Sequence, residues 1–475
     1  MTGLTARRPF GFRAIAIVLC MLAVVAASQV AVALRPAPPA VAPGVGSGAQ
    51  TDPLVPGLAD LDGLTSSGDG VADYSPGADV ERIRANIAFW SKRVARHPDD
   101  FVSSNRWGIA EIELARATGD VAAYLTAATA FDTTLKRDPD NAAALGYKGS
   151  VLVSLHRFVE ARELASAVIA RRPNDPVALA TLGDASLELG DVDGARRAYL
   201  HADEVAHGSS TLTRLAHLAF IMGDSDTALT IARDAVAAGS TEGVTGERAA
   251  FVQYQLAELL SMRGATREAG SVYAAALDAD PGSFLARSGL ARVAASTGDL
   301  DEAIDQLSAA ITIVPQPEFV ARRGDLYTLR GQPGDARRAA DDYATVEAIA
   351  KLAGEAANVY DRTLVYYLAN HGLDPDRAVR LAALELEVRK DVYGYDAYAW
   401  ALLAAGRADE AHSAIEDALA FGTRDARLIY HAGMIALARG DRDGARTQLK
   451  AALDLDASFD PLQVERARQA LAGLR

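Results

Sequence analysis

The sequence predicts an all-α protein, a right-handed α-solenoid of stacked helix-turn-helix repeats. The first observation is a period of 34 residues, which is typical of such repeats. The second is the regular placement of glycine-aspartate pairs and prolines between apolar stretches. The third is the recurrence of small residues where two paired helices have to approach closely. Residues that recur at this period are Gly149 and Gly183, Ala161 and Ala195, Pro139 and Pro173, Gly264 and Gly298, Ala269 and Ala303, Pro281 and Pro315, Gly406 and Gly440, and Ala411 and Ala445.

The segment from Pro176 to Gly208 shows how one repeat is built. Its first helix ends at Gly190-Asp191, because glycine fits a helix C-cap and aspartate caps the helix that follows. Ala195 and Ala202 on the second helix face Gly183 on the first, and a larger side chain there would push the two helices apart. In other units a proline closes the second helix, since it disfavours helix in the residue before it. These prolines are Pro139, Pro173, Pro281 and Pro315.

The pattern resembles that of the tetratricopeptide repeat family. The family's repeat has a small residue at its eighth position, followed by glycine, alanine, an aromatic residue, alanine and proline at set places. The unit that starts at Ala250 fills these places with Ala257, Gly264, Ala269, Tyr273, Ala276 and Pro281. The resemblance implies a solenoid of about ten repeats over residues 80–475, with late units starting at Val392 and Ala426. It also implies a surface that binds other proteins or peptide segments.

Two insertions interrupt the repeat register. The first contains Gly239 to Gly243, which we interpret as a loop, and the second predicts a lengthened helix from Asp335 to about Ala357. At the other end, the apolar face of Pro461 to Arg475 predicts a helix that caps the array.

Residues 1–35 differ in kind from the repeats. Arg7, Arg8 and Arg13 precede the charge-free residues 14–34, a stretch long enough to span a bilayer. The arginine asymmetry predicts a single-pass anchor in the cell membrane with the array outside the cytoplasm. A cleaved signal peptide is the alternative, and it would leave a secreted or periplasmic protein. The abundance of alanine and arginine beside only six lysines suggests a bacterial gene.

Residues 36–79 are predicted to be a disordered linker. The segment is rich in proline, glycine and serine, and it holds six aspartates with no lysine or arginine. Such a composition buries too little apolar surface to offset the entropy of ordering.

Composition and motifs exclude several classes of function. The net charge of −14 argues against nucleic acid as a partner, since phosphate binding requires a basic face. The single cysteine, Cys20, allows no disulfide within the chain. No phosphate-binding loop and no histidine pair with metal-ligand spacing occurs, so the sequence predicts no cofactor, no metal and no enzymatic activity.

The remaining hypothesis is a binding surface on the first helices of the repeats. Aromatic side chains gather on these helices near the C-terminus, where they could anchor a peptide or instead pack as core. The sequence thus predicts a non-enzymatic, membrane-tethered interaction scaffold. The alternatives are a secreted binding protein and a protein that binds a small molecule or glycan in the same groove. The candidate groove residues are Tyr366, Tyr367, Tyr393, Trp400, Tyr430 and Met434.

Overall fold

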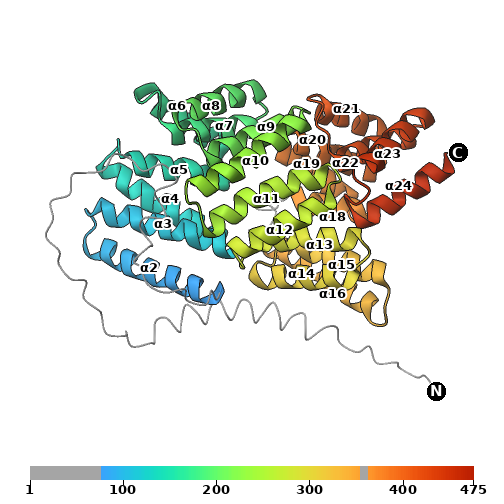
Figure 1. The fold of residues 1–475 in the computed structure, drawn as a ribbon, viewed down its shortest axis with the longest axis horizontal. Coiled ribbons are helices and arrows are strands. Elements are labelled where there is room, and N and C mark those ends of the chain that lie inside the picture. The colour runs from blue at the N-terminus through green and yellow to red at the C-terminus, as the bar shows by residue number, and fades with distance from the viewer. Residues whose placement is uncertain (1–75, 354–361, 475) are drawn as a thin grey trace, which may run out of the picture. The chain divides into compact units, whose positions relative to one another are not determined.

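The computed structural model describes residues 76–353 and 362–474, which form 22 helices and no strand (Figure 1). In these residues ten antiparallel helix pairs follow one another, from α3 and α4 to α22 and α23, with α2 before them and α24 after them. The predicted all-α solenoid is therefore confirmed. The helices are α2 (Pro76–Arg96), α3 (Phe101–Thr118), α4 (Val121–Arg137), α5 (Ala142–Ser154), α6 (Phe158–Arg171), α7 (Pro176–Glu188), α8 (Val192–Val205), α9 (Ser209–Ile221), α10 (Ser225–Thr241), α11 (Gly246–Met262), α12 (Thr266–Ala279), α13 (Phe284–Ser296), α14 (Leu300–Ile313), α15 (Pro317–Arg330), α16 (Asp335–Ala353), α18 (Arg362–His371), α19 (Pro375–Val388), α20 (Val392–Ala404), α21 (Ala408–Leu419), α22 (Ala426–Ala438), α23 (Arg442–Leu455) and α24 (Pro461–Gly473).

Local sequence sets the ends of these helices. The Asp175 carboxylate accepts the N–H of Ala178 at 3.0 Å and caps α7, and Asp191 does the same for α8. Between the two helices Gly190 adopts a φ of +83°, a conformation that favours glycine. The boundaries predicted at Gly190-Asp191, Val392 and Ala426 are confirmed.

The first insertion differs from its prediction. Helix α10 continues to Thr241, so most of the loop predicted at 239–243 is helical. Gly239 is buried in this last turn and packs near the side chain of Ser209 on α9. Packing against α9 therefore overrides the low helix propensity of glycine. The second insertion lengthens α16 to Ala353, and residues 354–361 lie outside the described residues.

Repeats that are far apart in sequence meet in the fold. The carbonyl of Glu188, the last residue of α7, accepts the N–H of Lys390 at 2.9 Å, and the Glu188 carboxylate accepts a hydrogen bond from Nε of Arg389 at 2.7 Å. The hydroxyl of Thr423 donates to the Ile221 carbonyl at 2.5 Å. These residues are separated by 201 and 202 positions, or about six repeats. The array therefore completes one superhelical turn in about six repeats, and successive turns touch.

Four glycine turns lie on this line of contact, which we call the closure. Each turn joins the two helices of one repeat. Three of the turns meet the link between two later repeats, and the fourth meets the link between α23 and α24. A Cβ atom at any of the four glycines would lie within 2.8 Å of an atom in the later segment that it faces. The pairs are Gly119 with Val314, Gly190 with Lys390, Gly223 with Gly422, and Gly264 with Leu455.

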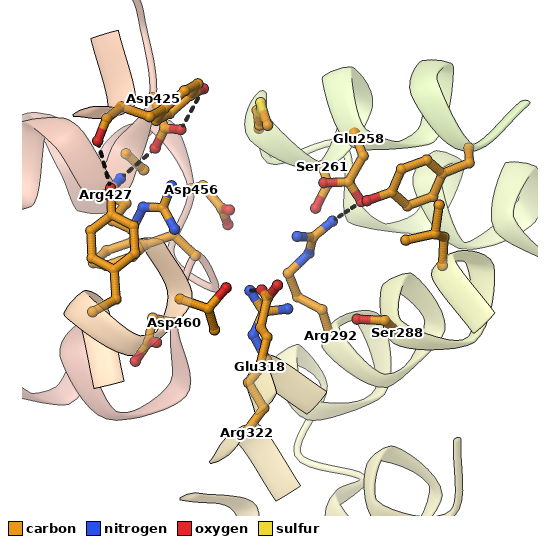
Figure 2. A pocket seen from close by; sticks show the side chains of 18 of the residues that line it. Glu258, Ser261, Ser288, Arg292, Glu318, Arg322, Asp425, Arg427, Asp456 and Asp460 are labelled. Atoms are coloured by element: carbon orange, nitrogen blue, oxygen red, sulfur yellow. Dashed lines mark hydrogen bonds and ion pairs between the residues drawn. The ribbon is translucent and has the colours of Figure 1, made fainter. Parts of the chain in front are cut away.

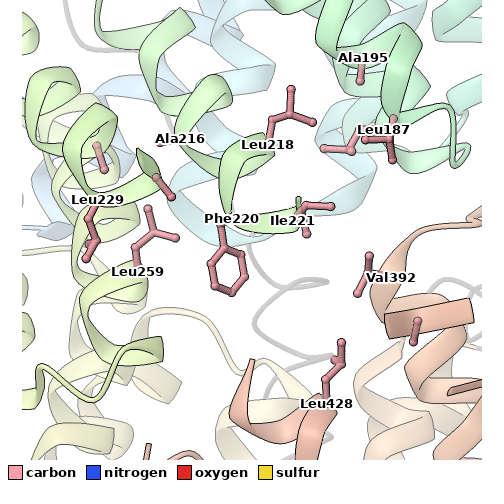
Figure 3. Close-up of a cluster of buried hydrophobic side chains, with 14 of the residues drawn as sticks. Leu187, Ala195, Ala216, Leu218, Phe220, Ile221, Leu229, Leu259, Val392 and Leu428 are labelled. Carbon is pink, nitrogen blue, oxygen red and sulfur yellow. The ribbon is translucent and has the colours of Figure 1, made fainter. Parts of the chain in front are cut away.

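A hydrophobic core spans the closure (Figure 3). Leu187 and Ile221 come from the ends of α7 and α9, whereas Val392 and Leu428 come from α20 and α22. All four side chains are at most 8% exposed and belong to one cluster. Apolar burial therefore holds the two turns of the superhelix together, in addition to the polar contacts.

Helix α24 does more than cap the last repeat. Besides α23 it contacts α15. Gln463 donates through Nε2 to Oδ1 of Asn370 at 2.6 Å, and Arg466 donates to the Asn370 carbonyl at 3.0 Å. The C-terminal helix thus ties the end of the array to its middle.

The predicted localisation needs correction. None of the helices within 76–353 and 362–474 is long and apolar enough to cross a membrane. The longest, α2, has 21 residues but carries charged side chains such as Glu81 and Lys92. This finding overturns the prediction of a single-pass protein in a bacterial cell membrane. The anchor or signal peptide predicted at 1–35, with residues 14–34 as its span, lies outside the described residues, as does the linker predicted at 36–79 up to residue 75.

The folded array is expected to lose stability in acid. His156, in the turn between α5 and α6, stacks on Phe158. Burial, helped by the charges of Arg389 and Arg362, lowers the pKa of His156 from 6.5 to about 4. Because the pKa of His156 is lower in the folded protein than in the unfolded chain, protonation favours the unfolded chain. The folded protein therefore keeps its full stability above pH 6.5 and loses stability as the pH falls towards 4. The loss reaches about 3 kcal/mol at pH 4.

A substitution tests this expectation. His156 has a φ of +56°, and asparagine tolerates that conformation without titrating. The His156→Asn variant should therefore lose less unfolding free energy than the wild type between pH 7 and pH 4, measured by urea denaturation. Equal losses in the two proteins would contradict the role of His156.

Candidate functional site

The first helices of the repeats surround a cavity of about 480 Å³. Its lining comes mainly from the first helices α9, α11, α13, α15, α18, α20 and α22. Ala232 and Ala235 of α10, the link between α23 and α24, and Gln463 of α24 complete it. Figure 2 shows Glu258 and Arg292 on one wall and Asp425 and Arg427 on the opposite wall. The closure creates this arrangement, because it brings the inner faces of late repeats opposite those of the middle repeats.

The repeat period places the charged residues of the first wall. Glu258, Arg292 and Asp325 each follow the small residue that contacts the second helix of the same unit, namely Ala257, Ala291 or Gly324. Equivalent positions in stacked repeats point in the same direction. Charged side chains at this position of successive repeats therefore form a column along the cavity.

The charges of the first wall are paired. Arg292 donates through Nη2 to Oε1 of Glu258 at 2.7 Å, and the Tyr273 hydroxyl donates to the same oxygen at 2.5 Å. Burial alone would raise the pKa of Glu258, but Arg292 and Tyr273 hold it below its usual value. Glu258 is therefore ionised at neutral pH. Next to this pair, Arg322 contacts Glu318 at 2.7 Å.

The opposite wall holds an arginine in a different setting. The guanidinium carbon of Arg427 lies 4.6 Å from the ring centroid of Tyr366 and 5.7 Å from that of Tyr393. The neighbouring carboxylate, Asp425, accepts the backbone N–H of Arg427 at 2.8 Å and the Tyr393 hydroxyl at 3.2 Å. Two aromatic faces thus orient this cation towards the cavity.

Two aspartates complete the polar lining. Asp456 accepts the N–H and hydroxyl of Ser458, and Asp460 accepts the N–H groups of Leu462 and Gln463 at the start of α24. Burial raises the pKa of both carboxyls above the usual value. Both groups therefore favour a ligand that brings a positive charge.

The structure separates the six predicted groove residues into two sets. Tyr366, Tyr367 and Tyr393 line the cavity. The other three lie with α23 and α24 in a hydrophobic cluster, where Tyr430 is fully buried and Trp400 is 6% exposed. The third member of this set is Met434, which is partly buried there.

Sequence reasoning missed the charged residues that dominate the cavity. They are Glu258, Arg292, Glu318, Arg322, Arg427, Asp456 and Asp460. A signal for part of this set was present, since Glu258 and Arg292 are 34 residues apart on inner positions. No comparable signal exists for Asp456 and Asp460, which lie in the link before α24.

Comparison with known proteins agrees with the repeat architecture. Tetratricopeptide repeat family models match residues 110–176, 152–218, 260–326 and 394–417. The chain therefore contains tetratricopeptide repeats. Proteins of this class bind peptides or other proteins, generally as scaffolds, and the fold is typically non-enzymatic. No curated protein matches this chain by sequence.

Several solved structures are similar in part. A thermophilic tetratricopeptide repeat protein of Thermus thermophilus, TTC0263, is 22% identical, with 44% of this chain and 99% of that chain covered and a TM-score of 0.35. Human IFIT1, solved as a dimer with m7Gppp-AAAA, is 14% identical, with coverages of 68% and 72% and a TM-score of 0.44. Yeast Tom70 is 13% identical, with coverages of 83% and 93% and a TM-score of 0.33.

Proposed function

We propose that this protein is a non-enzymatic interaction scaffold that binds a short segment of a partner protein in its central cavity. The observation that carries the proposal is the convergence of tyrosine, arginine and carboxylate side chains from six first helices, and from the link before α24, on one space. Rigid aromatic groups with a few well-placed charges are typical of binding sites. The predicted residues Tyr366, Tyr367 and Tyr393 belong to this proposed site, together with the charged residues around them.

The size of the cavity supports a segment as the ligand. A volume of about 480 Å³ falls within the range of about 300–1,000 Å³ that is usual for small-ligand pockets. A folded domain is far too large for this space, whereas a few residues of an extended chain fit. The backbone and side-chain contacts of the closure also limit how far the cavity can widen.

A site-specific photocrosslinker can test the proposal. His217 on α9 lines the cavity and has an exposed side chain, so a crosslinking residue at this position reaches the space. The matched control is His412 on the second helix α21, which is not among the residues that line the cavity. We expect irradiation of producing cells to attach peptides of one or a few proteins at position 217 and none of these at 412. Partner adducts at 412 with none at 217 would overturn the proposal.

A second candidate is a receptor for a small molecule or glycan. The cavity volume and the charged groups in its lining favour it, since both suit a compact polar ligand. The same experiment separates the two functions. A non-peptide adduct at position 217 would support the small-ligand function and count against the scaffold.

A further inference from the structure

The charges around the cavity are not balanced pair by pair. Six carboxylates and four arginines line the space. Arg292 and Arg322 contact Glu258 and Glu318, and Arg362 contacts Glu385 and Asp391. Arg427 differs from these three, because no carboxylate of the described residues lies within 4.0 Å of its guanidinium.

The guanidinium of Arg427 is held in place but has spare donors. The rings of Tyr366 and Tyr393 fix its position, and its buried Nε atom has no hydrogen-bond partner among the residues of the described ranges. An arginine is always charged and carries five N–H donors in a planar fork. A partly buried charge in this state gains from an acceptor that forms paired hydrogen bonds, and a carboxylate has the matching geometry.

Asp456 and Asp460 are carboxylates without a nearby positive charge to pair with among the described residues. Neither has a basic side chain within 4.0 Å in the part of the chain that the structure describes. The hydrogen bonds to each carboxylate fall on Oδ1, so Oδ2 remains for a ligand. The two groups flank the link that leads into α24, on the same cavity as Arg427 (Figure 2).

The surplus of carboxylates bears on the charge of the ligand. A dianion such as a phosphate monoester would meet six acids in a confined space of low dielectric. A single carboxylate needs only Arg427, whose guanidinium has no carboxylate within 4.0 Å among the described residues. A positive group elsewhere on the ligand would then restore the balance at the two aspartates.

We propose that the cavity selects peptides with two opposite charges, a carboxylate bound by Arg427 and a basic group bound by Asp456 and Asp460. This inference rests on the proposed scaffold function and names the chemistry of the segment that it binds. The carboxylate can come from the peptide's C-terminus or from an acidic side chain. Its chemistry is the same in both cases, so an experiment has to distinguish the sources.

Affinity selection from two synthetic pentapeptide libraries tests the inference. The libraries are identical except that one ends in a free carboxylate and the other in a carboxamide. The full chain is incubated with each, and mass spectrometry identifies the retained peptides. Retention from the free-carboxylate library alone identifies the C-terminus as the anion, whereas selection of aspartate or glutamate from both identifies a side chain. In either case we expect lysine or arginine to be enriched.

Three variants connect these preferences to the residues. Arg427→Gln should reduce the preference for the carboxylate about tenfold or more and keep that for the basic group, since one charged hydrogen-bonding partner is lost. Asp456→Asn should weaken the basic preference and keep that for the carboxylate. Each variant thus shows through its retained preference that the fold is intact. Arg196→Gln, on the exposed surface of α8, is the matched control and should retain both.

The outcomes distinguish the inference from the function on which it rests. Peptides that are retained without charge preference, or with preferences that Arg427→Gln and Asp456→Asn leave unchanged, would overturn the inference alone. Retention of no peptide from either library would overturn both the inference and the scaffold function.

Discussion

Replacement of Tyr430 by alanine is expected to lower the free energy of unfolding by about 3–5 kcal/mol, the range for removal of a large buried aromatic side chain. Tyr430 is fully buried on α22. Its ring centroid lies 5.3 Å from that of Phe459 and 5.6 Å from that of Trp400. The substitution would therefore leave a cavity where α20, α22 and the link to α24 meet. Chemical denaturation followed by circular dichroism measures the effect.

The matched control for this prediction is Tyr430→Phe. The buried Tyr430 hydroxyl has no hydrogen-bond partner among the described residues. Removal of the hydroxyl should therefore leave stability unchanged or raise it by about 1 kcal/mol, because an unsatisfied buried polar group is costly. If Tyr430→Ala unfolded at the same denaturant concentration as Tyr430→Phe, the ring would not be part of the core. In that case a role as an exposed groove residue would regain support.

The second large effect is expected at the closure. Gly223 has a φ of +80°, and a Cβ atom there would lie 2.5 Å from the carbonyl oxygen of Gly422. Alanine at this position incurs about 1–2 kcal/mol for the left-handed conformation. The collision with the opposing backbone adds about 1–3 kcal/mol or separates the two superhelical turns. We expect Gly223→Ala to destabilise the array by about 2–5 kcal/mol in total.

Gly298 provides the control that separates these two costs. Its φ of +84° is almost the same, but a Cβ atom there meets nothing within 4 Å. Gly298→Ala should therefore show only the conformational cost. Hydrogen exchange should report faster opening at Ile221 and Thr423 in Gly223→Ala and not in Gly298→Ala. Equal destabilisation by the two substitutions, without local opening, would show that the turns do not depend on this contact.

The burial of Trp400 and Tyr430 decides which substitutions can test binding in the predicted groove. Alanine at Trp400 or Tyr430 would disturb the core as well as any binding, so a loss of partner capture by such variants would be uninformative. Substitutions of side chains that line the cavity, such as Arg427, avoid this difficulty. The distinction depends on burial, which the repeat pattern alone does not give for an aromatic residue on a first helix.

The sequence by itself determined the repeat class, the all-α solenoid and many helix boundaries of this protein. These features depend on residues that are close together in the chain. Asp191 caps the helix that follows it, Gly190 ends the one before it, and Gly183 leaves room for the ring of Tyr199 in the same repeat. Three of the predicted groove residues also fall on the cavity, because inner positions follow from the repeat register.

Only the tertiary structure decided that the array closes on itself and which inner side chains share a cavity. The contacts of Glu188 with Arg389 and of Ile221 with Thr423 join residues about 200 positions apart. Their formation depends on small rotations between neighbouring repeats, and these rotations accumulate over about six units. No local sequence motif therefore predicts the total rotation. The placement of Arg427 opposite Glu258 and Arg292 (Figure 2), with no carboxylate of the described residues within 4.0 Å of its guanidinium, follows from the same accumulated geometry.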